Sequence, residues 1–322
     1  MPIRNGLENM TSLEALTMPT HNLSKVGLTL MSLLTYTAMV VMNEGAASGA
    51  FKDIFNTATG NISRLFDTDF TPAPWTFQIW NVIYLWQYMW LGFVLSRLFR
   101  RNELGWVYMK PDILPNSFYF LWMLNNILSI EWLFLWDRMH LIPSLLMMVL
   151  RMVTCYIALI ISHRALHPHT VWLKKHSYGD LLLVRILVQN GITLYATWTT
   201  IATLLNFTVV LVYLGDVCNT TATITSLCIL FFGLMGWFYL ETVVFDKYVR
   251  YNLTVYPGVL LALAGVLKKK PISYSPNSTS VLVVLLLVVT GGLGTIRLIV
   301  LAGRKLKELM NEPAPPTVRI VS

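Results

Sequence analysis

Two aromatic stretches decide how this chain folds. Residues 71–84 read Thr-Pro-Ala-Pro-Trp-Thr-Phe-Gln-Ile-Trp-Asn-Val-Ile-Tyr, and residues 195–206 read Tyr-Ala-Thr-Trp-Thr-Thr-Ile-Ala-Thr-Leu-Leu-Asn. Either stretch alone is typical of an aromatic membrane helix. Together they place polar-tipped aromatic side chains and an Asn inside apolar helices. A lipid bilayer gives no reason for that placement, whereas a buried ligand pocket would.

The composition predicts an integral membrane protein. Of the 322 residues, 55% are hydrophobic and only 12% are charged, against about 25% charged residues in soluble domains. The mean hydropathy is +0.59. The net charge of +8 fits the basic cytoplasmic loops of membrane proteins, and we prefer this to nucleic-acid binding. The three cysteines are too few and too scattered for a disulfide framework.

Apolar runs of about 20 residues are long enough to cross a bilayer as helices. Eight such runs occur, at residues 26–43, 77–98, 115–136, 142–163, 190–213, 223–244, 252–268 and 281–303. The seventh is short and contains Pro257, so it is the least certain to span. We therefore predict an all-α, polytopic membrane bundle of about eight transmembrane helices.

The distribution of charge predicts the topology. With the N-terminus inside, most Lys and Arg residues fall in inner segments, and only Lys268–Lys270 form a basic cluster outside. We therefore expect residues 1–25 and a disordered tail, 304–322, to be cytoplasmic. Three predicted outer loops contain Asn-x-Ser/Thr glycosylation candidates, at Asn61, Asn219 and Asn277. These sequons favour the plasma membrane or an endomembrane.

Several predicted helices carry stripes of aromatic and polar side chains, because residues three or four apart share a face. One stripe pairs Trp80 with Tyr84. The other two stripes comprise Trp122, Asn126, Ser129, Trp132 and Trp136, and then Tyr195, Trp198, Ala202 and Asn206. A ligand pocket and ordinary helix packing explain this pattern equally well.

The same motifs resemble those of the TspO/translocator-protein family, the tryptophan-rich sensory proteins, in its extended multi-helix subgroup. The resemblance covers roughly residues 28–215, with the order of motifs kept. The pattern of the family's second helix is matched by Pro72 or Pro74, Trp75, Phe77, Trp80 and Tyr84. The pattern of its fifth helix is matched by Tyr195, Trp198, Ala202 and Asn206, although Leu194 replaces the family's proline.

The resemblance implies a five-helix core, 26–215, with a lid loop, 44–76, and three additional helices in 216–303. It also implies a flat hydrophobic ligand, such as a tetrapyrrole or a sterol, bound between helices. The ligand-binding residues implied by the motifs are Trp80, Tyr84, Trp132, Tyr195, Trp198, Ala202 and Asn206. The sterol-recognition stretch of the family is incomplete here, because no cationic residue follows Tyr213.

Two charged residues fall inside predicted membrane helices that are neighbours in sequence. Glu131 and Arg151 differ in depth by only about 6 Å when counted from the shared outer end of their helices. Since intramembrane charges are usually paired or line a cavity, we predict an ion pair between them. The pair would act as a structural clamp, or it would couple transport of a small solute in a secondary transporter, which is the alternative function.

The sequence has no arrangement typical of an enzyme active site. It contains no phosphate loop, zinc motif, dinucleotide fingerprint or nucleophile–base pattern, so we predict no enzymatic activity, no metal and no dedicated cofactor. The expected partners are the lipid bilayer and a hydrophobic ligand. The family resemblance adds the mitochondrial outer membrane as an alternative location, and a homodimer stays an open alternative.

Overall fold

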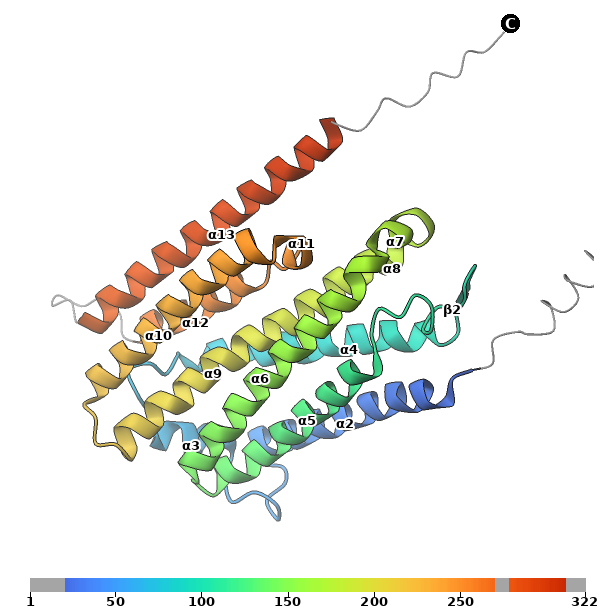
Figure 1. Cartoon of the computed structure of the whole chain (residues 1–322). Helices are drawn as coiled ribbons and strands as arrows, with labels where there is room; N and C mark the ends of the chain where they lie inside the picture. Colours follow the sequence, from blue (N-terminus) through green and yellow to red (C-terminus); the bar gives the residue numbers. More distant parts are fainter. Residues whose placement is uncertain (1–20, 270–277, 311–322) are drawn as a thin grey trace, which may run out of the picture.

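Long helices form nearly all of the structure. The computed structural model describes residues 21–269 and 278–310 (Figure 1). The long helices of this described part are α2 (Leu23–Ser48), α4 (Ile79–Arg97), α5 (Asn116–Asp137), α6 (Leu141–Leu166), α9 (Gly191–Tyr213), α10 (Asn219–Tyr239), α12 (Val255–Lys269) and α13 (Ser278–Met310). The predicted all-α membrane bundle is confirmed.

Short elements connect the long helices. The helical ones are α3 (Thr59–Leu65), η1 (Pro74–Gln78), η2 (His167–His169), α7 (Thr170–His176), α8 (Tyr178–Leu183), η3 (Val184–Asn190), η4 (Leu240–Val244) and α11 (Asp246–Val249). The strands β1 (Arg101–Asn102) and β2 (Gly105–Trp106) form a small antiparallel hairpin after α4. Gly105 turns this hairpin with a φ of 111°, a value that favours glycine.

Each predicted span corresponds to one long helix. Six helical segments of the described residues are long and apolar enough to cross a membrane; α4 and α12 are outside that set. With 15 residues, α12 is about 22 Å long, shorter than the roughly 30 Å of a hydrocarbon core. Full crossing by α12 therefore stays a prediction. Pro257 lies in its first turn, where a missing N–H does no harm.

Two predicted boundaries need correction. The helix α13 continues to Met310, so residues 304–310 are helical and do not belong to a disordered tail; residues 311–322 lie outside the described part. The helix α2 continues through Ser48 and ends at Gly49, whose φ is 71°. The lid loop, predicted from residue 44, therefore begins one turn later and contains α3 and η1.

The helix α9 lies at the centre of the bundle. It packs against α6, α10, α12 and α4, and all of its residues from Gly191 to Thr199 are buried. Its polar residues are therefore enclosed by protein. The π-helical turn η3 joins it to α8, and the Asn190 side chain donates to the carbonyl of Arg185 there at 2.8 Å.

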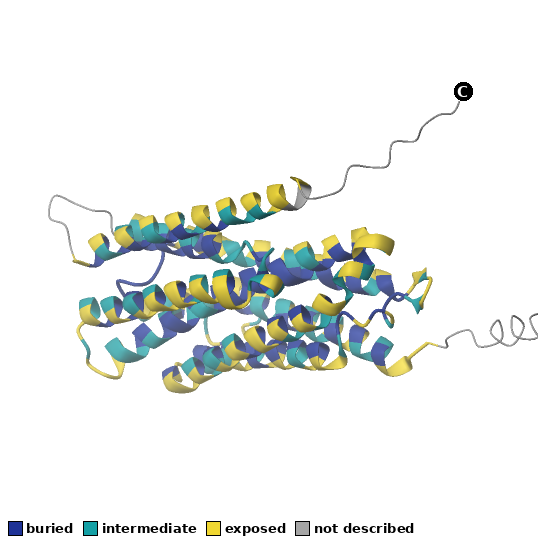
Figure 2. Cartoon of the chain, turned by 45° about the horizontal axis from the view of Figure 1, so that its top comes forward, coloured by how far each residue is buried: buried dark blue, intermediate teal, exposed yellow. Residues whose placement is uncertain are grey.

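The outward faces of the peripheral helices are apolar. Figure 2 shows exposed residues along the outer sides of the helices and buried residues between them. The exposed residues include Leu34, Leu85, Phe232 and Val288 on four different helices. An apolar surface of this extent suits contact with lipid acyl chains.

The last part of the lid loop leads into α4 and is held by α12; we call this part, residues 71–78, the strap. The N–H of Ala73 donates to the carbonyl of Gly265 at 3.0 Å. A Cβ on Gly265 would lie 2.2 Å from Thr76 Oγ1 and 3.0 Å from the Cβ atoms of Pro72 and Thr76. Only glycine allows this approach, so the strap depends on α12, one of the additional helices.

Replacing Gly265 by Ala should therefore loosen the strap. We expect the free energy of unfolding to fall by about 1–3 kcal/mol, as for overpacked cores, measured as thermal unfolding in detergent. Adding Thr76→Ala should restore part of the loss, because Thr76 Oγ1 makes no hydrogen bond within the described residues. The matched control is Gly236→Ala, where a Cβ meets open space. Equal effects at both glycines would contradict the steric argument.

Candidate ligand site

Four of the predicted ligand-binding residues meet between α4 and α9. The ring of Trp80 lies 5.5 Å from that of Tyr84, 6.2 Å from that of Tyr195 and 6.4 Å from that of Trp198, as measured between centroids. The contacts with α9 are edge to face, the geometry that aromatic quadrupoles prefer. Tyr195 and Trp198 are buried, whereas Trp80 and Tyr84 are partly exposed. We call these four residues the aromatic cluster.

Two further predicted residues meet between α5 and α9. The indole N–H of Trp132 donates to Asn206 Oδ1 at 3.3 Å, and Asn206 Nδ2 donates to the carbonyl of Ala202 at 2.9 Å. Trp132 also stacks on Trp136, with centroids 5.7 Å apart. Ala202 thus contributes its backbone to this group, and both ends of the Asn206 amide have a hydrogen-bond partner.

Arg151 of α6 joins the two groups. Its Nη2 donates to the hydroxyl of Tyr195 at 3.1 Å. Its Cζ lies 5.9 Å from the ring of Trp132 and 6.0 Å from the ring of Tyr195, within the range of a cation–π contact. Arg151 therefore contacts one predicted site residue of each group, Tyr195 and Trp132.

The predicted ion pair between Glu131 and Arg151 is not formed. Glu131 is exposed on α5, and within the described residues no carboxylate lies within 4 Å of Arg151. The depths match, but the side chains point in different directions around α5. Asn125 and Trp132 are seven residues apart, about two turns, and both contact Arg151 or its partners. Glu131 is rotated by about 100° from Trp132.

Two important polar residues of the site were missed from the sequence. Asn125 Oδ1 accepts the hydroxyl proton of Tyr195 at 2.7 Å, while its Nδ2 donates to the carbonyl of Arg151 and to Thr154 Oγ1. The hydroxyl of Tyr36 on α2 donates to the carbonyl of Tyr84 at 2.9 Å. An amide inside an apolar span is the signal that could have identified Asn125.

The site contains hydrogen-bond donors without acceptors. Arg151 Nε and the indole nitrogen of Trp122 are both buried and make no hydrogen bond within the described residues. Trp122 belongs to the same region, since its ring lies 6.0 Å from that of Tyr195. A buried donor left without a partner costs about 1–3 kcal/mol. The bundle therefore keeps unused hydrogen-bonding capacity around Tyr195.

In this conformation the aromatic rings pack against one another. A cavity of about 420 Å³ lies at the N-terminal ends of α2 and α5, beside Lys25 and Asp112, and another of about 370 Å³ lies beside Arg100 and Asp180. Neither reaches the aromatic cluster. A ligand at the cluster would have to separate Trp80 and Tyr84 from the two buried rings of α9.

Comparison with known proteins identifies the family. A family model described as TSPO-like protein matches residues 29–297. The chain belongs to the TSPO-like protein family. The matched region includes α10, α12 and most of α13, so the additional helices lie within it. Searches of curated proteins and of solved structures gave no match.

The glycosylation candidates of this TSPO-like protein differ in their surroundings. Asn61 is exposed on α3, and its amide lies 3.3 Å from Thr57 Oγ1. The amide of Asn219 donates to Asp69 Oδ1 at 3.0 Å, and Asn219 Oδ1 accepts the N–H of Asp69. A glycan on Asn219 would disrupt this pairing of α10 with the lid loop. Asn277 lies outside the described residues.

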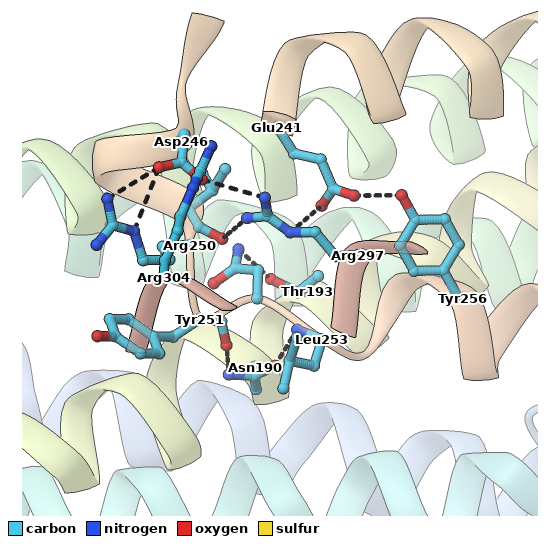
Figure 3. A network of polar contacts seen from close by, with 12 residues as sticks. Asn190, Thr193, Glu241, Asp246, Arg250, Tyr251, Leu253, Tyr256, Arg297 and Arg304 are labelled. Atoms are coloured by element: carbon cyan, nitrogen blue, oxygen red, sulfur yellow. Dashed lines mark hydrogen bonds and ion pairs between the residues drawn. The ribbon is translucent and has the colours of Figure 1, made fainter. Parts of the chain in front are cut away.

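A second polar network joins the additional helices to one another (Figure 3). Arg297 of α13 lies 3.8 Å from Glu241 Oε2 and donates to Asp246 Oδ1 at 3.1 Å. Tyr256 of α12 donates to Glu241 Oε1, and Arg250 and Arg304 also bind Asp246. Both acids and all three arginines have partners of opposite charge, so every charge of this network is paired within the network.

The same region attaches these helices to the core. Asn190 Nδ2 donates to the carbonyl of Tyr251 at 2.7 Å, and Asn190 Oδ1 accepts the N–H of Leu253 at 2.8 Å. Asn252 Nδ2 donates to Thr193 Oγ1 of α9 at 3.0 Å, and the same nitrogen lies 3.0 Å from His163 Nε2 of α6. Within the described residues no group of three His, Cys, Asp or Glu side chains could hold a metal ion.

Removing the hydroxyl of Tyr195 should destabilise the bundle, because Arg151 Nη2 and Asn125 Oδ1 would each lose a buried partner. We expect Tyr195→Phe to lower the free energy of unfolding by about 1–3 kcal/mol, measured by thermal unfolding in detergent. The control is Tyr239→Phe, on an exposed tyrosine, which should leave the unfolding temperature unchanged. An unchanged temperature in both variants would show that the hydroxyl adds nothing.

Asp246 should make stability depend on pH in a defined direction. Burial alone would raise its pKa, but hydrogen bonds from Arg250 and Arg297 and the nearby charges outweigh this, so the pKa lies below its ordinary value of 3.8. The carboxylate therefore stabilises the folded state above its ordinary pKa, and this contribution is lost as the pH falls through the lowered value.

We expect Asp246→Asn to lower the free energy of unfolding by about 1–3 kcal/mol at pH 7, because three arginines each lose one carboxylate, although Arg297 keeps Glu241. The gap between wild type and variant should close as the pH falls below 3.8. Unfolding temperatures at a series of pH values measure this, with Asp53→Asn, on an exposed residue, as control. A gap of constant size over that range would contradict the assignment.

Proposed function

We propose that this TSPO-like protein binds a flat, largely apolar small molecule between α4, α5, α6 and α9. The observation that carries the proposal is a connected set of aromatic rings inside the bundle: Trp80 packs on Tyr195 and Trp198, and Tyr195 and Trp132 both contact Arg151. Aromatic faces favour flat apolar ligands, while convergent polar groups set their orientation. Family membership supports a tetrapyrrole or a sterol as the type of ligand.

The lid loop and strap would cover this site from the outer end. Phe77 of the strap packs edge to face on Trp198, with centroids 6.5 Å apart. Asp137 at the end of α5 accepts hydrogen bonds from the backbone of Asn56 and Thr57. These contacts support a lid that is ordered and placed next to the aromatic cluster. We also propose that the five-helix core holds the ligand and that the additional helices position the strap.

A role in solute transport has less support. Its basis in the sequence is the predicted ion pair between Glu131 and Arg151, and that pair is not formed. We propose binding, with sensing or movement of the ligand as its consequence, and no enzymatic reaction. We further propose that both termini are cytoplasmic and that the membrane is the plasma membrane or an endomembrane, since Asn61 offers an exposed sequon.

A titration tests the proposed site. Purified protein in detergent would be titrated with protoporphyrin, haem and cholesterol, following tryptophan fluorescence and, for the porphyrins, ligand absorbance. We expect saturable binding of at least one compound. In Trp80→Phe/Trp198→Phe, binding should weaken about tenfold, which corresponds to 1.4 kcal/mol of lost contact.

The matched control is Trp106→Phe/Trp172→Phe, which removes two tryptophans, in β2 and α7, outside both the aromatic cluster and the strap. This variant should bind like the wild type, so it separates loss of the site from loss of fluorophores. Absence of binding by wild type, or equal weakening in both double variants, would reject a flat-ligand site at the aromatic cluster.

A further inference from the structure

A cavity lies at the end of the bundle where α2 and α5 begin, away from the aromatic cluster. The two helices pack against each other (Figure 1), and the cavity at their first turns measures about 420 Å³. Small-molecule sites measure about 300–1,000 Å³, so this cavity is large enough for a polar headgroup. The polar residues of its wall include Lys25, Asp112, Asn116 and Ser117.

Lys25 is the most deeply buried residue of this wall. It is the third residue of α2, and only 5% of it is exposed. Its ammonium donates to Asp112 Oδ1, which is the one partner that the ammonium has within the described residues. Asp112 itself lies at the mouth, since 48% of its side chain is exposed. An ammonium carries three N–H donors, so Lys25 keeps two of them for a further acceptor.

A second buried cation adds to the positive charge at this end. Arg97 is 2% exposed and has no carboxylate within 4 Å in the part of the chain that the structure describes. Its Nη2 lies 3.4 Å from the carbonyl oxygen of Pro111, the residue before Asp112. The nearby Asp180 is held by another arginine at 2.7 Å. Lys25 and Arg97 therefore share a single carboxylate, Asp112, and one positive charge stays uncompensated.

Neutral donors and an apolar face extend from the mouth of the cavity. Asn116 and Ser117 are exposed, and neither side chain has a hydrogen-bond partner among the described residues. The first turn of α5 has no side-chain cap, so its backbone N–H groups add partial positive charge. Phe120 and Leu124 share a face with Ser117 and are exposed. The polar cavity thus continues into an apolar strip on the outside of α5.

We propose that this cavity binds the phosphate group of a membrane lipid, with Lys25 as its charged partner. The site shares no residue with the aromatic cluster, so the inference does not rest on the proposed function. The phosphate would accept the ammonium N–H groups that Asp112 leaves unused and would compensate the excess positive charge. Asn116 and Ser117 would donate at the mouth, while an acyl chain would lie along Phe120 and Leu124.

Two lipids that differ only in the phosphate test this. Dioleoyl phosphatidic acid and dioleoylglycerol have the same acyl chains, but only the first carries a phosphate. Native mass spectrometry of the full-length protein in a non-ionic detergent measures the binding of each. We expect the wild type to bind the phosphatidic acid about tenfold more tightly than dioleoylglycerol. Equal binding of the two lipids by wild type, which needs no variant and hence no assumption about folding, would overturn the proposal.

Two variants should act in opposite directions. In Lys25→Gln the preference for phosphatidic acid should fall to about threefold or less, because the charged partner is lost. Asp112→Asn should bind phosphatidic acid about threefold more tightly than wild type, because a carboxylate no longer competes for the ammonium. A purely structural ion pair predicts the same direction for both variants, so weaker binding by Asp112→Asn would overturn the assignment. Lys174→Gln, on an exposed residue of α7, is the control for general charge attraction and should keep the full preference.

Inorganic phosphate offers the same chemistry without an acyl chain, and competition distinguishes the two sources. We expect millimolar phosphate to displace phosphatidic acid only weakly, because the ion makes no contact with the exposed face of α5. Displacement by phosphate as effective as by a second phosphatidic acid, and lost in Lys25→Gln, would keep the phosphate on Lys25 and reject the lipid. The titration of the aromatic cluster is unaffected by either result, so the two sites are tested separately.

Discussion

The hydroxyl of Tyr195 is the contact on which the arrangement of the core depends. Inside a bilayer, no water is available to form hydrogen bonds with a buried polar group, so its partner must be another group of the protein. Tyr195 accepts from Arg151 of α6 and donates to Asn125 of α5, so one atom of α9 fixes three helices in rotation and depth. Many rotations of a helix about its axis could satisfy close packing of apolar side chains. Only a few rotations allow two hydrogen bonds to form at the single hydroxyl oxygen of Tyr195.

The additional helices make this arrangement possible, because they enclose α9. A helix with Tyr195, Trp198, Thr199 and Asn206 on several faces could not lie against lipid without exposing polar groups. On the side away from α6, α10 and α12 cover it, and Gly258 lets α12 approach Thr197 and Leu194 closely. The same helix α12 holds the strap at Gly265. The additional helices therefore support the candidate site from two directions, and the self-contained charge network around Asp246 holds these helices together.

Much of this could be predicted from the sequence, because hydropathy and helical spacing are local properties. They were sufficient for the eight long helices and for the stripes that place Trp80 beside Tyr84 and Tyr195 beside Trp198. The prediction of an ion pair between Glu131 and Arg151 was wrong. It compared the depths of the two residues in the membrane but left out the direction in which each side chain points around its helix axis. The role of Asn125 was missed because it depends on which faces of three helices meet, and that is decided by packing far apart in sequence. The Gly265 contact was missed for the same reason, since it joins α12 to a strap nearly two hundred residues earlier.

The closed aromatic cluster also indicates which side would open for a ligand. The rings of α9 are held in place: Tyr195 by two hydrogen bonds and Trp198 by burial between Phe77 and Trp80. The rings of α4 are partly exposed, and neither Trp80 nor Tyr84 has a side-chain hydrogen bond within the described residues. Separating the two sets therefore costs ring contacts of about 0.5–1.5 kcal/mol each on the α4 side, whereas moving α9 would break the bonds to Asn125 and Arg151. A ligand would accordingly replace α4 rings as neighbours of α9, and the fixed face of the site would be the one that carries Arg151.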